Sequence, residues 1–118
     1  GNSGPYLQYT FARTQSVLSK SRISFARSHL AKLEQEEVSL LRALSKFPEV
    51  VEEAGGKFAP NILCNYLFDL AQKFNLFYQK HQIIKGENKE FRINLTMAVG
   101  QIIKNGLNLL GISAPERM

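Results

Sequence analysis

The spacing of apolar residues is the feature that most constrains how this chain can fold. In three long segments and two short ones, apolar side chains recur every three or four positions, which is the period of an α-helix. No segment alternates polar and apolar residues in the way that predicts a strand. The sequence therefore predicts an all-α fold, a helical bundle of about four to five helices in a single domain over residues 1–118. The helices are expected over residues 5–22, 36–47, 49–54, 60–84 and 89–110.

Proline and glycine mark the predicted helix ends. Pro48 separates the two short helices, and Pro60 begins the long one, because proline fits the first turn of a helix. Gly86 and Gly111 follow the last two helices, where glycine accepts the left-handed conformation of a helix C-terminus. Residues 21–33 fit either a loop or a continuation of the first helix.

The net formal charge of +5 comes entirely from the first third of the chain. Residues 1–33 contain five basic and no acidic residues, whereas ten basic and ten acidic residues follow from Glu34 onward. Such asymmetry favours a surface that faces a polyanion. A solvated basic helix that only keeps the domain in solution would give the same pattern.

One face of the first predicted helix combines aromatic and basic side chains away from the apolar stripe. Tyr6, Tyr9, Arg13 and Lys20 lie on this face of the helical wheel. Aromatic rings stack on unpaired bases, and neighbouring cations neutralise their phosphates, so the face suits a single-stranded RNA loop. The alternative is that the two tyrosines pack beneath another helix or another domain.

Polar residues of the long helix also fall outside its apolar arc. Gln72 and Asn75 lie there with Phe68, and an aromatic ring beside amide groups could read base edges; a second helix layer over this face is the alternative. Arg92 falls inside the apolar arc of the last helix. Its head is expected to reach the rim or to pair with Asp69 or Glu90.

The sequence offers no catalytic or metal-binding pattern. His29 and His81 lack a cysteine, carboxylate or second histidine at metal-ligand spacing, and the lone Cys64 cannot form an internal disulfide. The glutamates, Glu37 among them, are expected on solvated helix faces. Because Cys64 has no partner cysteine in the chain, we expect a reducing, cytoplasmic compartment. Apolar runs are too short to cross a bilayer and the start has no signal-peptide pattern, so we expect no membrane contact.

Four motifs in order resemble the C-terminal, DALR-type anticodon-binding domain of arginyl-tRNA synthetases, which are class I aminoacyl-tRNA synthetases. They are GNSGPYLQY with the following Arg13, LSKFPEVVEEA over residues 44–54, the residues NYL, DLAQKFN and FY within 65–78, and the GL, LLGI and APERM residues within 106–118. The resemblance covers nearly the whole chain except residues 21–33.

The resemblance implies a bundle that grips the anticodon arm of the arginine-accepting tRNA. Positions matching Tyr9 and Arg13 approach the anticodon loop in the family. Those matching Tyr66, Phe74, Tyr78 and Met118 lie near the splayed anticodon bases. The wheel instead places Tyr66 and Phe74 on the apolar arc of the long helix, which favours a place in the core. The resemblance and the helical wheel together give a set of candidate tRNA-binding residues. The set is Tyr6, Gln8, Tyr9, Arg13, Lys20, Gln72, Asn75, Tyr78, Arg117 and Met118.

The resemblance also implies that this chain binds and positions tRNA while catalysis belongs to a catalytic domain that would precede residue 1. That domain would join arginine to tRNA with ATP and magnesium, so no cofactor and no catalytic residue is expected in residues 1–118. Two alternatives remain open at this point. The bundle could bind RNA without sequence preference, or it could be a protein-interaction module docking through Tyr6 and Tyr9.

Overall fold

The computed structural model describes residues 3–21 and 32–115, and this part of the chain is built from five helices without a strand. The all-α prediction is confirmed. Most helix ends agree with the prediction to within two or three residues, and residues 22–31, the core of the uncertain connection, lie outside the described part. The helices are α1 (Ser3–Lys20), α2 (Gln35–Ser45), α3 (Phe47–Gly56), α4 (Pro60–Lys80) and α5 (Lys89–Leu109).

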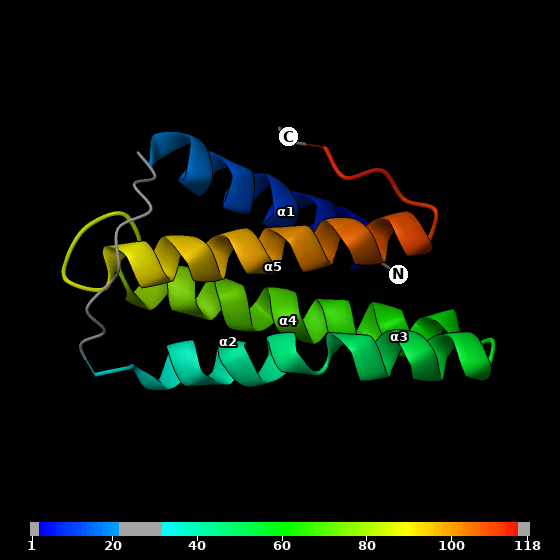
Figure 1. The fold of residues 1–118 in the computed structure, drawn as a ribbon. Helices are drawn as coiled ribbons and strands as arrows, with labels where there is room; N and C mark the ends of the chain where they lie inside the picture. Colours follow the sequence, from blue (N-terminus) through cyan, green and yellow to red (C-terminus); the bar gives the residue numbers. More distant parts are fainter. Residues whose placement is uncertain (1–2, 22–31, 116–118) are drawn as a thin grey trace.

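The helix α4 ends four residues earlier than the sequence predicts. His81 has an extended backbone, and residues 81–88 form a loop that leads to α5 (Figure 1). The apolar pattern runs on past the helix end because Ile83 packs into the core from the loop, with 5% of its surface exposed. The loop turns into α5 at Gly86, whose φ of 97° favours glycine.

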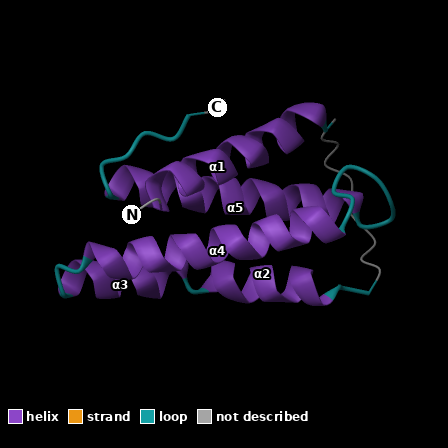
Figure 2. Cartoon of the chain, turned by 180° about the vertical axis from the view of Figure 1, so that it is seen from behind, coloured by secondary structure: helices purple, strands orange, loops and turns teal. Residues whose placement is uncertain are grey.

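The helices α4 and α5 form the centre of the bundle. α1 packs against both of them on one side, and α2 packs against both on the other, while α3 continues the line of α2 along α4. Figure 2 shows the same arrangement from behind, with α1 and the α2–α3 pair at opposite edges. The apolar stripes of the three long helices meet between them. The largest fully buried apolar side chains are Phe74, Phe77, Leu7, Leu40, Leu67, Leu70, Ile103, Leu107 and Val99.

The chain after α5 returns toward the start of α1. Gly111 takes a φ of 77°, and the amide of Ile112 donates to the carbonyl of Leu107, which ends the helix. Ala114 then packs against the core, and the Gln8 side chain donates to the Ser113 carbonyl at 2.9 Å. The described part of the tail therefore lies against the first turns of α1.

The acidic residue Glu37 contradicts the expectation of solvated glutamates. Its side chain is fully buried and pairs with Arg92, with 3.3 Å between Oε2 and Nε. Arg92 therefore has the predicted structural role, but its carboxylate partner is Glu37 rather than the expected Asp69 or Glu90. The wheel could not show this pair because it joins residues of different helices.

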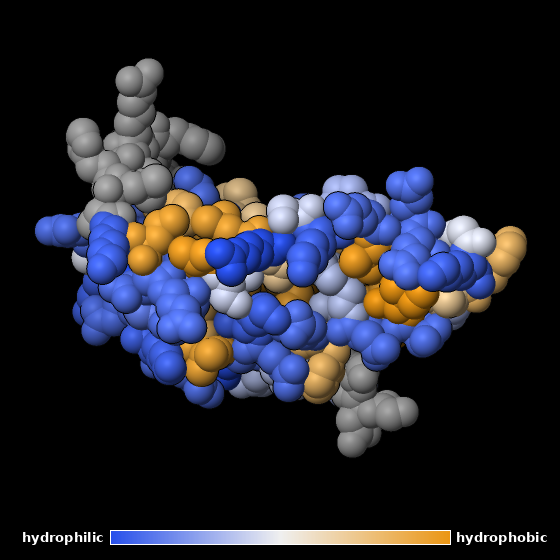
Figure 3. Space-filling model, turned by 90° about the horizontal axis from the view of Figure 1, so that it is seen from below, coloured by the Kyte–Doolittle hydropathy of each residue, from blue (hydrophilic) through white to orange (hydrophobic). Residues whose placement is uncertain are grey.

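The face formed by α2 and α3 is mainly hydrophilic (Figure 3). Figure 3 shows hydrophilic side chains over most of it, with apolar side chains in separate groups. None of the helices in the described part combines the length and the apolar character needed to cross a membrane.

The helices α1 and α5 are in close contact at Gly100. A Cβ atom placed on Gly100 would lie 2.6 Å from Thr14 Oγ1 and 3.3 Å from Thr14 Cβ. Thr14 is fully buried and its hydroxyl donates to the Phe11 carbonyl at 2.6 Å, so this side chain has no room to move. The position therefore requires glycine to keep the two helices in contact.

Replacing Gly100 with alanine is expected to cost roughly 1–3 kcal/mol of unfolding free energy, because the extra methyl group overpacks the contact. Urea denaturation measures the loss. Gly55→Ala is the matched control, since nothing lies within 4 Å of its added Cβ. The control should gain about 0.4–1 kcal/mol from the smaller entropy of its unfolded chain. Equal stability of the two variants would contradict the account of this contact.

Candidate nucleic-acid interface

An open pocket of about 770 Å³ lies between α1 and the loop that follows α4. One wall comes from residues 9–20 of α1, the other from the loop, and the end of α4 lies between them. The first wall is the polar side of α1. It faces solvent because the apolar stripe of the same helix is buried against α4 and α5. The lining residues are Tyr9, Ala12, Arg13, Ser16, Val17, Lys20, Tyr78, His81, Gln82, Ile83, Ile84 and Lys85.

The guanidinium group of Arg13 contacts two tyrosine rings. Its Cζ is 5.0 Å from the centroid of the Tyr9 ring and 4.4 Å from that of Tyr78. One nitrogen, Nη2, donates to the Tyr9 hydroxyl at 3.0 Å, and Nη1 donates to Asn75 Oδ1 at 2.8 Å. Cation–π contact with both rings and two hydrogen bonds fix the orientation of the guanidinium group before any ligand arrives.

The amide of Asn75 connects α4 to α1 beneath the pocket. Its Oδ1 accepts the bond from Arg13, and its Nδ2 donates to the Tyr6 hydroxyl at 2.9 Å and to Thr10 Oγ1 at 3.1 Å. Both donor protons of the amide nitrogen are therefore used inside the protein. Asn75 acts on the pocket through Arg13, because its own amide nitrogen is occupied.

The pocket lining is positively charged. Among the described residues that form it, none is acidic. Arg13, Lys20 and Lys85 contribute three cations. His81 also lines the pocket and lies 2.7 Å from Glu36, measured from Nε2 to Oε1. The hydrogen bond from His81 holds the pKa of the Glu36 carboxyl below its ordinary value. The pocket therefore presents cations and two half-exposed aromatic rings to solvent, since Tyr9 is 49% and Tyr78 40% exposed.

This arrangement suits a ligand that is both flat and negatively charged. An unpaired nucleotide has this character, because its base stacks on an aromatic face and its phosphate is neutralised by nearby cations. In the described residues no three histidine, cysteine, aspartate or glutamate side chains gather in a way that could hold a metal ion.

The structure brings four of the predicted site residues into one pocket, namely Tyr9, Arg13, Lys20 and Tyr78. Asn75 lies beneath it. Gln72 is exposed on α4 and does not line the pocket, and Gln8 holds the tail through Ser113. Arg117 and Met118 lie outside the described residues.

Four further aromatic residues that were candidates from the sequence are partly or fully buried, and for Tyr6 and Phe68 this agrees with the alternative of packing beneath another helix. Tyr6 and Phe68 fall outside the apolar faces of the helical wheel, but each is partly buried, with 5.1 Å between their ring centroids. Phe74 is fully buried in the core. The Tyr66 hydroxyl donates to the Ala43 carbonyl at 2.6 Å, and burial raises the pKa of this phenol to about 12. These four rings support the bundle, while Tyr9 and Tyr78 face the pocket.

Sequence reasoning missed the second wall, residues 81–85. The apolar pattern through Ile83 and Ile84 extended the predicted helix over these residues and concealed the loop. Lys85 beside Gly86 was the one available signal, because a cation next to a turn glycine commonly lies at the surface.

Replacing Asn75 with leucine should lower the unfolding free energy by roughly 1–3 kcal/mol, because Tyr6 and Thr10 lose a hydrogen-bond donor in a partly buried position. Gln72→Leu is the matched control, an amide on the same helix that is exposed and should change stability by at most about 0.5 kcal/mol. Thermal unfolding of both variants tests the difference. A control that loses as much as Asn75→Leu would refute the role assigned to this amide.

Comparison with known proteins identifies the family of this chain. The profile of the DALR anticodon binding domain family matches residues 7–118. The chain is 43% identical to the arginine–tRNA ligase of Thermococcus kodakarensis and 39% identical to that of Flavobacterium psychrophilum, over 100% of this chain and 20% of each of those proteins. It thus spans about a fifth of the length of these relatives.

Solved structures give the same result. The Thermus thermophilus arginyl-tRNA synthetase superposes with a TM-score of 0.90 at 33% identity, over 100% of this chain and 21% of that one. The Plasmodium falciparum enzyme superposes with a TM-score of 0.87 at 26% identity, over 100% of this chain and 22% of that one. The profile match over nearly the whole chain shows that it belongs to the DALR anticodon-binding domain family.

Proposed function

We propose that this domain binds the anticodon arm of tRNA(Arg) as part of an arginyl-tRNA synthetase. The observation that carries the proposal is the orientation of Arg13 by contact with Tyr9 and Tyr78 in a cationic pocket. The relatives that match along the whole chain are arginine–tRNA ligases, which supports the choice of tRNA. Together they favour this interpretation over a protein-docking surface.

The pocket would act on bases that leave the stack of the anticodon loop. An unpaired base has a free face for Tyr9 or Tyr78, and its edge can accept hydrogen bonds from the oriented Arg13. Lys20 and Lys85 lie on opposite walls, where they would neutralise the flanking phosphates. The proposed binding thus divides between rings that recognise the base and cations that hold the backbone.

In the proposed parent protein, the ligation of arginine to tRNA belongs to a catalytic domain in the same chain. ATP and magnesium would be used there, in the cytoplasm, and not in this bundle. The contribution of the bundle would be orientation, because a tRNA held at its anticodon presents its acceptor end to a distant active site.

Lys20→Glu is expected to weaken binding of an arginine-specific anticodon stem-loop by about tenfold at low salt, because it replaces a phosphate-neutralising cation with an anion. The matched control is Lys104→Glu, the same charge change at an exposed position of α5. Fluorescence titrations over a range of salt concentrations give the slope, which should become less steep by roughly 0.7 when one phosphate is no longer neutralised. Equal weakening in the two variants would indicate a nonspecific charge effect and contradict the proposal that the pocket binds the RNA.

A scrambled stem-loop that binds as tightly as the specific one would indicate sequence-independent RNA binding.

Tyr9→Ala should reduce the affinity for the same stem-loop by roughly 1–3 kcal/mol, because one stacking platform is removed. Phe58→Ala provides the control, because Phe58 is an exposed aromatic residue at the α3–α4 turn, far from the pocket in sequence and space. Circular dichroism checks that both variants remain helical. If Tyr9→Ala loses thermal stability and retains its affinity, Tyr9 packs rather than stacks.

A further inference from the structure

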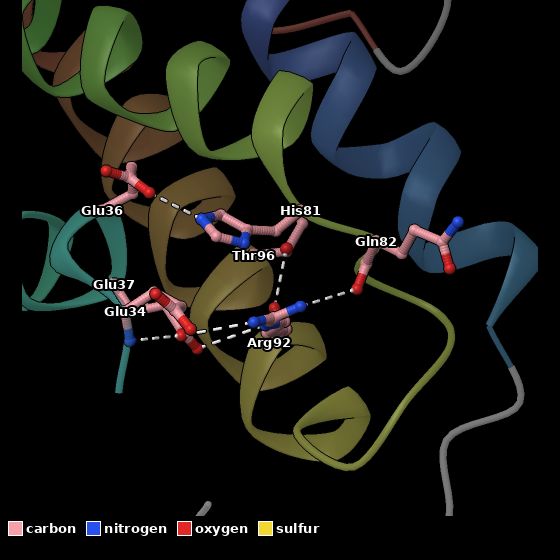
Figure 4. Close-up of polar contacts among 7 residues, drawn as sticks. All are labelled: Glu34, Glu36, Glu37, His81, Gln82, Arg92 and Thr96. Atoms are coloured by element: carbon pink, nitrogen blue, oxygen red, sulfur yellow. Dashed lines mark hydrogen bonds and ion pairs between the residues drawn. The ribbon is translucent and has the colours of Figure 1, made fainter. Parts of the chain in front are cut away.

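A cluster of polar contacts joins the start of α2, the start of α5 and the loop after α4 (Figure 4). Arg92 of α5 donates through Nε to Glu37 Oε2 at 3.3 Å and through Nη2 to Glu37 Oε1 at 3.4 Å. Its third nitrogen, Nη1, donates to the backbone carbonyl of Gln82 at 3.1 Å. One guanidinium group therefore contacts both a helix and the loop.

The ion pair is held in a nearly dry environment. The Glu37 side chain is 0% exposed and that of Arg92 is 14% exposed. Glu37 Oε1 also accepts the amide of Glu34 at 2.9 Å, so both carboxylate oxygens have partners. A buried ion pair of this kind adds little stability over a well-packed apolar pair, because desolvation offsets the attraction. Stability alone therefore gives a weak reason for arginine at this position, whereas the contact with the loop gives a specific one.

The loop contact lies directly behind the pocket. Gln82 is the second residue after α4, and residues 81–85 form the pocket wall that faces α1. The preceding residue, His81, is tied to the same turn of α2 through Glu36 at 2.7 Å. Glu36 thus holds His81 directly, and its neighbour Glu37 holds Gln82 through Arg92.

We propose that Arg92 is a positioning residue for RNA binding, which holds the 81–85 wall at the distance from α1 that an anticodon nucleotide requires. This inference rests on the proposed function. Arg92 does not line the pocket, so it acts through the Gln82 carbonyl and not by contact with RNA. The fixed backbone sets the place of Lys85, the cation that this wall contributes.

Arg92→Lys separates positioning from stability. A lysine keeps a positive charge beside Glu37, but its single ammonium group lacks the planar fork that reaches the carboxylate and the Gln82 carbonyl together. We expect the variant to bind the anticodon stem-loop about tenfold more weakly. Losing a hydrogen bond from a charged group lowers the population of the positioned wall by about that factor, and the apparent affinity falls with that population. Backbone amides of residues 82–86 should exchange hydrogen faster than in the unsubstituted domain, while those in the middle of α5 exchange at an unchanged rate.

Leu63→Val is the control for a simple loss of stability. Leu63 is buried at the start of α4, about 25 Å from the loop at 1.5 Å per residue along the helix. This variant should lose stability without losing affinity at a temperature where both variants are folded. Equal weakening of RNA binding by the two variants would overturn the inference, as would unchanged loop exchange in Arg92→Lys.

The proposed function and this inference fail in different ways. If the unsubstituted domain binds no stem-loop, the proposed function fails and the inference falls with it. If the unsubstituted domain binds and Arg92→Lys binds equally well, only the inference fails. Weaker binding by Arg92→Lys together with faster loop exchange, and neither change in Leu63→Val, supports it.

Discussion

The side-chain amide of Asn75 is the constraint on which the pocket depends. It accepts one hydrogen bond from Arg13 and donates two to Tyr6 and Thr10, so three residues of α1 converge on one residue of α4. These bonds fix the rotation of α1 about its axis. With that rotation fixed, the apolar stripe faces the core and the side of α1 that carries Tyr9 turns to solvent. Packing of the stripe alone would leave the guanidinium group of Arg13 free to adopt several rotamers, because an arginine side chain has high conformational entropy.

The helices and the first wall of the pocket were predictable because both follow from local periodicity. Apolar spacing located all five helices, and the wheel placed Tyr9, Arg13 and Lys20 on one face. What escaped prediction depends on contacts between distant residues. Glu37 and Arg92 are 55 positions apart, and Arg13 and Asn75 are 62 positions apart. No wheel shows such pairs. For the same reason the loop wall was missed, since Ile83 continues the helical pattern in sequence while its backbone is already outside the helix.

Arg13 is held in place without being neutralised. Its partners are two tyrosine rings, a phenol oxygen and an amide oxygen, and none of these carries a full negative charge. In the described part of the chain no carboxylate pairs with it. A carboxylate would orient the guanidinium group equally well, but it would cancel the field that attracts a phosphate. The tyrosines therefore contribute twice, since they orient the cation and remain partly exposed to solvent.

Arg92 shows the opposite use of the same side chain. Its charge is cancelled by the buried Glu37, so it adds little to the potential at the surface, and what remains is the geometry of a planar group with several donors. The two arginines lie on either side of the loop wall, one facing the pocket and one behind it. Both contribute equally to the net charge of +5, yet only the arginine with uncharged partners can attract a polyanion. The partner of each arginine, and not its position in a basic segment, decides whether it serves binding or structure.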